Sequence, residues 1–297
     1  MSSESALLSR VYQQGGACGM RNLKFTLAYD GSEFYGWQVQ PELPTVQAAL
    51  AAAIVRVTGE TVLPQGSGRT DAGVHALAQV ASLSLKSEIP SANLQVALND
   101  ALPASIRVTH VTEVESAFHA RKSAQGKTYC YRIYRGQVCP PFLARYVFHY
   151  PYPLNEEAMM AASREVEGEH DFTSFAAVDA EDHGRIGRAS VAFEMERSNV
   201  RRIFESSWER IVEDNKSSTC TASGATNGES AYELVYTVRG SGFLHHMVRN
   251  LVGCFLLIGR NRLTRADIPR ILEERSRSQN PGATAPGHGL YLVSVDY

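Results

Sequence analysis

The chain has 297 residues, 44% of them hydrophobic, which is enough for one large or two ordinary globular domains. With 29 basic and 31 acidic residues it is nearly neutral, which excludes a uniformly basic nucleic-acid binder but leaves room for a local basic cleft. Five cysteines without a CxxC pair argue against a disulfide framework or a structural zinc site and favour the reducing cytoplasm. No signal peptide is visible, and the longest strongly apolar run, 251–258, is too short to span a membrane.

The first half of the chain predicts strands that alternate with helices. Residues 1–20 are polar and are expected to be disordered, so the first strand is predicted at 23–29, where apolar residues alternate. Thr45 is a suitable N-cap for a helix that ends at Gly59, because apolar residues recur between them at helical spacing. A strand at 77–85, a helix from residue 91 and a strand at 106–114 follow along the chain.

The second half has the same style. Strands are predicted at 127–135, 189–196, 202–213, 231–239 and 290–295, and helices at 155–168, 243–258 and 264–275. Paired strands with intervening helices indicate an α+β fold with a mostly antiparallel sheet. The segment 214–230 is rich in Ser, Thr, Gly and Asn and is interpreted as a surface loop.

The most informative stretch runs from Gly68 to Ala76, where Asp71 lies between glycines and Arg69 precedes it by two residues. Glycines on both sides permit a tight turn and the close approach of a ligand. On the residues alone, Asp71 is a turn aspartate that caps a backbone amide, a nucleophile, a general base or a metal ligand. A phosphate-cradling loop is disfavoured because the GxxxxGK[ST] pattern is absent and the carboxylate would repel phosphate.

Two further positions are candidate site residues. Tyr129 lies on the same face of its predicted strand as Tyr131, where it either packs in the core or offers a ring for base stacking and a phenol for proton transfer. Arg249 lies off the main apolar stripe of the helix predicted over 243–258. It has apolar neighbours, so it either reaches to solvent or pairs with a carboxylate or phosphate.

Basic residues gather in the last third of the chain, with eight arginines between residues 239 and 277 and a smaller cluster at 197–202. Together they predict a surface for the phosphate backbone of a nucleic acid. The adjacent residues His245 and His246 are not expected to point the same way on a helix, and no His, Cys or Asp cluster has ligand spacing. No metal site is therefore predicted.

Several motifs, taken in order, resemble the bacterial tRNA pseudouridine synthase A family over about residues 21–297. They are Tyr29-Asp30-Gly31, Gly36-Trp37-Gln38, Gly68-Arg69-Thr70-Asp71-Ala72-Gly73-Val74-His75, Phe118-His119-Ala120-Arg121, Lys127-x-Tyr129-x-Tyr131, Asp171-Phe172-Thr173-Ser174-Phe175, Phe243-x-His245-His246-Met247-Val248-Arg249-Asn250 and Gly289-Leu290-Tyr291-Leu292. No single motif is decisive, but their order along the chain is highly specific.

The resemblance implies a cofactor-free isomerase that converts uridine to pseudouridine in the anticodon stem-loop of tRNA, conventionally at nucleotides 38, 39 and 40. By this resemblance Asp71 is the nucleophile, and Tyr129 stacks on the target uracil. Arg249 pairs with the catalytic carboxylate, and Arg69 helps to take the base out of the stack. The family works as a homodimer in which the tRNA contacts both subunits, and no nucleotide cofactor is expected.

The resemblance also implies two similar α+β halves that share one mostly antiparallel sheet flanked by helices, with the active-site cleft between them. Residues 21–115 would form the half with the Asp71 loop, and residues 116–297 would form the other half. Three segments depart from the family pattern: 1–20, 179–202 and 214–230. They are interpreted as an extension, a poorly fitting stretch and a surface-loop insertion, and they could alter which uridines are modified.

Uridine isomerisation breaks an N–C glycosidic bond, turns the uracil and forms a C–C bond. The carboxylate can attack either C1′ of the sugar or C6 of the base, and flipping out the uridine costs roughly a few kcal/mol. Two other functions compete with this one. A non-catalytic RNA-binding protein would use the same basic clusters but gives Asp71 no role, and a hydrolase using Asp71 with His75 has no second acid or oxyanion motif.

Overall fold

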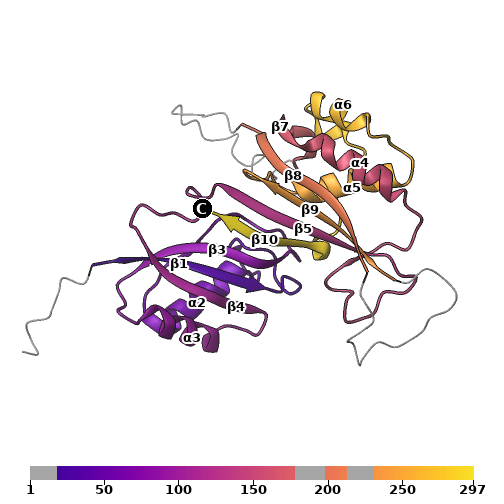
Figure 1. Cartoon of the computed structure of the whole chain (residues 1–297). Coiled ribbons are helices and arrows are strands. Elements are labelled where there is room, and N and C mark those ends of the chain that lie inside the picture. The colour runs from indigo at the N-terminus through magenta and orange to yellow at the C-terminus, as the bar shows by residue number, and fades with distance from the viewer. Residues whose placement is uncertain (1–18, 178–197, 213–230) are drawn as a thin grey trace, which may run out of the picture.

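The N-terminal half begins with a strand and two helices placed as the sequence predicts. The computed structural model describes residues 19–177, 198–212 and 231–297 (Figure 1). The elements of this half are β1 (Arg21–Tyr29), α2 (Val46–Thr58), β2 (Gln65–Gly66), β3 (His75–Leu85), α3 (Ser91–Ala101) and β4 (Ile106–Val114). The Thr45 side chain accepts a hydrogen bond from the backbone of Ala48 at the start of α2, and Gly59 ends the helix with φ 76°.

The C-terminal half contains five longer elements and several short ones. They are β5 (Gly126–Tyr134), β6 (Phe148–His149), α4 (Glu156–Ser163), β7 (Gly168–Asp171), β8 (Val200–Ile211), β9 (Glu233–Gly240), α5 (Met247–Gly259), α6 (Asp267–Glu273) and β10 (Leu290–Asp296). Strand β5 alternates as predicted, with Tyr129, Tyr131 and Ile133 buried on one face.

One ten-stranded sheet runs through both halves in the order β4-β1-β3-β10-β5-β9-β8-β7, with β2 on β3 and β6 on β5. Most pairs are antiparallel, but β10 runs parallel to β3, where Tyr291 is opposite His75. On its other edge β10 is antiparallel to β5, where Leu292 is opposite Tyr129. The last strand of the chain therefore joins the two halves, as Figure 1 shows by the yellow strand between β3 and β5. The predicted α+β fold with a mostly antiparallel sheet is confirmed.

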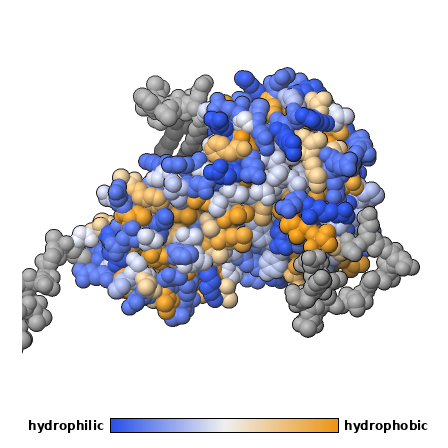
Figure 2. Space-filling view, in the orientation of Figure 1, coloured by the Kyte–Doolittle hydropathy of each residue, from blue (hydrophilic) through white to orange (hydrophobic). Residues whose placement is uncertain are grey.

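Helices cover each half of the sheet separately. Helices α2 and α3 lie together on the N-terminal half, and α4, α5 and α6 lie together on the C-terminal half (Figure 1). A single cluster of buried apolar side chains extends through both halves, from Phe25 on β1 to Phe255 on α5. On the face seen in Figure 2, apolar residues gather in the middle of the molecule, whereas the end that carries α6 is mostly hydrophilic.

Two predicted helices differ from the structure in their bounds, and three predicted segments lie wholly or almost wholly outside the described residues. The helix predicted over 243–258 begins only at Met247, and the one predicted over 155–168 ends at Ser163 and is followed by a 3-10 turn. The strand predicted at 189–196, the loop 214–230 and nearly all of the extension 1–20 lie outside the described residues. The division into residues 21–115 and 116–297 stays a prediction. Within the described ranges, no helix has the length and apolar character needed to cross a membrane.

Candidate active site

Asp71 lies in the connection between β2 and β3, immediately before a tight turn formed by Ala72 and Gly73. Gly73 has φ 74°, a conformation that residues with a Cβ rarely adopt, and Val74 donates a backbone hydrogen bond to the Asp71 carbonyl at 3.1 Å. The turn carries the Asp71 side chain at the end of a long buried strand. It is 19% exposed, so it remains open to a ligand.

The backbone of residues 34–37 packs against this loop and holds it in place. Trp37 donates its N–H to the carbonyl of Thr70 at 3.0 Å, and Gly73 donates to the carbonyl of Phe34 at 3.2 Å. Gly36, with φ 88°, approaches so closely that a Cβ on it would lie 2.4 Å from the Thr70 oxygen. The loop before Asp71 is thus held by main-chain contacts that only glycine permits at this position.

Buried polar groups fix the other side of the loop. The Tyr29 hydroxyl and the Thr70 hydroxyl are 2.8 Å apart, and burial raises the pKa of Tyr29 to about 12. The Lys127 ammonium donates to the carbonyl of Ser67 at 2.7 Å. Burial, assisted by the positive charges of nearby arginines, lowers the pKa of Lys127 to about 8. These contacts tie the start of the Asp71 loop to β1 and β5.

Arg249 reaches this carboxylate from the first turn of α5. Its Nη1 donates to Oδ2 of Asp71 at 2.9 Å, and its Nε donates to the carbonyl of Ala285 at 2.6 Å. The two side chains are only 15% and 19% exposed, so the ion pair is partly shielded from water. Arg249 therefore has the carboxylate partner that a partly buried guanidinium requires. The structure brings together two residues that are 178 positions apart in the sequence.

Tyr129 and Arg69 are placed differently from each other. Tyr129 is buried on β5, with its ring packed edge-on against Phe243 at a centroid distance of 5.0 Å. Burial, followed by the effects of Tyr29 and the negative charge of Asp71, raises the pKa of Tyr129, so it is held as a neutral phenol near the carboxylate. Arg69 is exposed, and within the described ranges its side chain makes no hydrogen bond or ion pair.

Two histidines complete the surroundings of Asp71. The Nε2 atoms of His245 and His246 lie 3.6 Å from Oδ1 and 3.4 Å from Oδ2 of Asp71, and their rings are 4.0 Å apart. The expectation that adjacent histidines diverge is wrong here, because both residues precede α5 and His246 adopts a left-handed backbone with φ 58°. Asp71, His245 and His246 are the described residues that could together hold a metal ion.

Comparison with known proteins identifies the family. The model of the tRNA pseudouridine synthase family matches residues 26–121 and 162–297. The chain belongs to this family. A tRNA pseudouridine synthase A of Solibacter usitatus is 45% identical over 278 residues, which are 94% of this chain and 100% of that relative. Enzymes of the same name from Moorella thermoacetica and Limosilactobacillus fermentum are 44% and 40% identical, over 93% and 94% of this chain and 99% and 96% of their own lengths.

In this member of the tRNA pseudouridine synthase family, the two matched segments carry the two partners of the ion pair. Asp71 lies in the first segment and Arg249 in the second, whereas Tyr129 lies in the stretch 122–161 between them. The contact between Asp71 and Arg249 therefore joins the two parts of the chain that match the family model.

His75 belongs to a structural network of this synthase-family protein rather than to the nucleophile. Its Nδ1 accepts the Gly31 N–H at 3.1 Å, and its Nε2 lies 3.1 and 3.2 Å from the carbonyls of Arg145 and His288. Oδ1 of Asp30 lies 3.2 Å from Nδ1 and favours the charged ring. Burial is the larger effect, so the pKa of His75 is lowered and the neutral imidazole is favoured. A hydrolase that pairs His75 with Asp71 has no support in this geometry.

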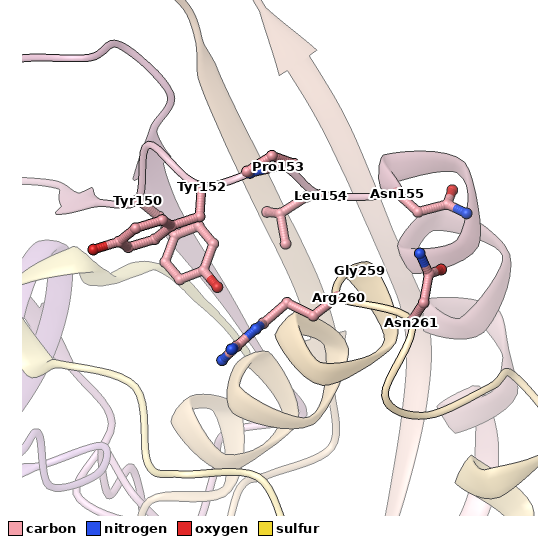
Figure 3. A pocket seen from close by; sticks show the side chains of 8 residues that line it. All are labelled: Tyr150, Tyr152, Pro153, Leu154, Asn155, Gly259, Arg260 and Asn261. Atoms are coloured by element: carbon pink, nitrogen blue, oxygen red, sulfur yellow. The ribbon is translucent and has the colours of Figure 1, made fainter.

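A hollow in the described part of this family member lies away from Asp71. It has a volume of about 640 Å³ and is lined by Tyr150 and by residues 152–155 and 259–261. Figure 3 shows Arg260 extending from the end of α5 toward Tyr152. Arg249 is near the start of α5 and Arg260 follows its end, so the helix separates the two places by roughly 15 Å. Neither the sequence nor the family match assigns a role to this hollow.

Proposed function

We propose that this protein isomerises uridine to pseudouridine in the anticodon stem-loop of tRNA, at nucleotides 38, 39 and 40, with Asp71 as the nucleophile. The observation that carries the proposal is the 2.9 Å ion pair between Asp71 and Arg249 in a chain of this family. It gives the loop carboxylate a fixed orientation and a compensating charge, which a turn aspartate with a purely structural role does not need.

The proposed chemistry requires an ionised carboxylate in a partly dry site. Asp71 attacks C1′ or C6, the N1–C1′ bond breaks, the uracil turns, and C5 bonds to C1′. The proton that leaves C5 is balanced by the proton gained at N1, so no atom is lost and no electron acceptor is needed. Arg249 donates to Oδ2, which leaves Oδ1 to face the substrate. No redox or phosphoryl chemistry occurs, so the reaction needs no cofactor.

Tyr129 and Arg69 have complementary roles in this proposal. Tyr129 is a buried, neutral phenol next to the carboxylate, so it stacks on the uracil and donates a hydrogen bond rather than acting as a phenolate base. Arg69 is exposed two residues before Asp71, where a long cationic side chain can enter the space that the flipped nucleotide leaves in the RNA stem. We also propose a cytoplasmic homodimer in which the tRNA contacts both subunits.

The test replaces the carboxylate with its amide in Asp71→Asn, which preserves the size of the side chain. Purified protein is incubated with an anticodon stem-loop RNA that carries tritium at C5 of uridine, and tritium released to water reports loss of the C5 proton. We expect release to fall to background while RNA binding is retained. Asp100→Asn on α3 is the matched control, because Asp100 is exposed on the N-terminal half. Full activity of Asp71→Asn would contradict the proposed nucleophile.

A further inference from the structure

Three metal-binding side chains meet at the Asp71 carboxylate. Every pair of the ligand atoms of Asp71, His245 and His246 lies within 4.8 Å. Two of these distances are 3.6 Å, from His245 Nε2 to Oδ1, and 3.4 Å, from His246 Nε2 to Oδ2. Tetrahedral zinc with bonds of about 2.1 Å places neighbouring ligand atoms about 3.4 Å apart. The distance from His245 Nε2 to Oδ1 is thus close to one edge of such a tetrahedron, and His246 lies near enough for a small side-chain adjustment to bring it to the same ion.

An unusual backbone conformation produces this convergence. His246 has φ 58°, in the left-handed region that glycine favours, and it precedes the first turn of α5. Residues with a Cβ occupy this region at a cost of about 1–3 kcal/mol, and such strain concentrates at functional sites. The surrounding main chain holds the turn, since Ala177 donates to the His245 carbonyl at 2.9 Å and Asn250 donates to the His246 carbonyl at 2.9 Å. The imidazoles therefore face the same carboxylate instead of diverging.

We propose that Asp71, His245 and His246 form a binding site for a divalent transition-metal ion such as Zn²⁺ or Co²⁺. Two imidazoles and one carboxylate suit these ions, whereas Mg²⁺ and Ca²⁺ prefer oxygen ligands. The side chains are 42%, 28% and 19% exposed for His245, His246 and Asp71, so the ion enters from solvent without unfolding of the site. Water fills the remaining coordination positions.

Arg249 determines which oxygen of the Asp71 carboxylate is available to the metal ion. Its guanidinium occupies Oδ2 at 2.9 Å, so the ion binds on the Oδ1 side, and Arg249 acts as the hydrogen-bonding partner of a metal-bound carboxylate. The repulsion between the two cations weakens binding, which makes the site reversible.

A metal ion at Oδ1 removes the nucleophile from the reaction. The ion and a flipped uridine then compete for the same carboxylate, so the metal inhibits and RNA displaces it. This consequence rests on the proposed function, whereas the metal site itself does not.

The test measures metal binding directly on the full chain. Protein treated with a chelator is titrated with Co²⁺ alone, and visible d–d absorption reports the ion in a tetrahedral or five-coordinate site. We expect saturable one-to-one binding that Zn²⁺ reverses. His246→Gly removes an imidazole and suits the left-handed backbone, and His245→Ala removes the other. Each variant should weaken Co²⁺ binding by about tenfold or more. His110→Ala, an exposed histidine on β4, should leave it unchanged.

Two outcomes overturn the metal site. One is the absence of saturable Co²⁺ binding to the intact protein, and the other is binding that changes by less than about twofold in both histidine variants while their circular dichroism stays native. A separate arm adds anticodon stem-loop RNA to the cobalt-loaded protein. If the histidine variants lose Co²⁺ but RNA does not displace it from the intact protein, the metal site stands and the proposed function is contradicted.

Discussion

Asp71 and Arg249 meet between the two halves of the sheet, and each half positions its residue by different means. The N-terminal half holds the Asp71 loop by its backbone, because Trp37 donates to the Thr70 carbonyl and Gly36 lies directly against that oxygen. In the C-terminal half, Arg249 lies on a buried helix. Its long side chain reaches Asp71 and is oriented by hydrogen bonds to Asp71 and to the Ala285 carbonyl. A close-packed backbone cannot shift without cost, whereas a side chain can be changed locally.

This difference predicts how substitutions act. Changes beneath the Asp71 loop should affect stability and activity together, because the loop is part of the packed structure. Changes at the end of the Arg249 side chain should affect activity more than stability, because the helix that carries it stays packed by its apolar residues.

The largest effect is expected for Gly36→Ala. The new Cβ would lie 2.4 Å from the Thr70 carbonyl oxygen, and φ 88° is strained for alanine. Strain of about 1–2 kcal/mol and overpacking of about 1–3 kcal/mol together predict a loss of roughly 2–5 kcal/mol of stability. Urea unfolding measures that loss, and tritium release from C5-labelled RNA should fall in parallel because the Thr70–Asp71 backbone must move.

Gly59→Ala is the control that separates strain from close approach. Gly59 has φ 76°, similar to Gly36, but a Cβ there would meet nothing within 4 Å. It should lose only the backbone strain of about 1 kcal/mol and retain full activity. Equal losses of activity in Gly36→Ala and Gly59→Ala would show that the close contact between Gly36 and the Thr70 carbonyl does not position Asp71.

A smaller and more selective effect is expected for Arg249→Lys. Lysine keeps the positive charge but cannot donate to both Asp71 and the Ala285 carbonyl in the geometry of the guanidinium. Loss of one charged hydrogen bond costs about 1.5–3 kcal/mol, which corresponds to about ten- to 150-fold in kcat/KM. Steady-state kinetics should show this decrease with little change in the urea midpoint.

The matched substitution is Arg260→Lys, beyond the other end of the same helix. Arg260 is exposed and has no contact with Asp71, so its kcat/KM should stay within about twofold of wild type. A decrease as large as that of Arg249→Lys would mean that loss of any guanidinium near this helix, rather than loss of the ion-pair geometry at Asp71, lowers activity.

Much of the fold could be predicted because local signals agree with the final packing. Thr45 and Gly59 mark the ends of α2, and the alternation of Tyr129, Tyr131 and Ile133 gives the buried face of β5. The sheet order could not be predicted from these signals. The insertion of β10 between β3 and β5 depends on contacts between residues more than 150 positions apart, which no local period records.

The site shows the same division between local and distant information. The position of Arg249 off the apolar stripe left two alternatives, exposure to solvent or a carboxylate or phosphate partner, and only the family resemblance indicated the catalytic carboxylate. The meeting of His245 and His246 at Asp71 was missed because the helix was predicted to begin four residues too early, over 243–258 instead of at Met247. The residue before Met247 is a histidine that makes no side-chain capping hydrogen bond, so the start of this helix lacks the usual Ser, Thr, Asp or Asn signal.

His75 lies where β3 pairs with β10, and it makes the stability of the protein depend on pH. Burial lowers the pKa of His75 below its ordinary 6.5, so at pH values just below 6.5 the unfolded chain binds a proton at this residue more readily than the folded chain does. Stability should therefore fall as the pH decreases below about 6.5. In His75→Gln this contribution is removed, so the free energy of unfolding should change less between about pH 7 and 5.5 than in wild type. Identical slopes in urea titrations would assign the acid sensitivity to other groups.

The smallest effect is expected for Tyr152→Ala, at the hollow beside the end of α5. Tyr152 is 65% exposed and packs edge-on against Tyr150 at a centroid distance of 5.4 Å, so its removal leaves the core intact (Figure 3). The hollow lies near the far end of α5 from Arg249, and no contact connects Tyr152 to the Asp71 loop within the described ranges. We expect kcat/KM within about twofold of wild type and a stability change within about 0.5 kcal/mol. A fall in activity comparable to that of Arg249→Lys would place substrate contacts at this hollow and extend the functional surface of the C-terminal half along the whole helix.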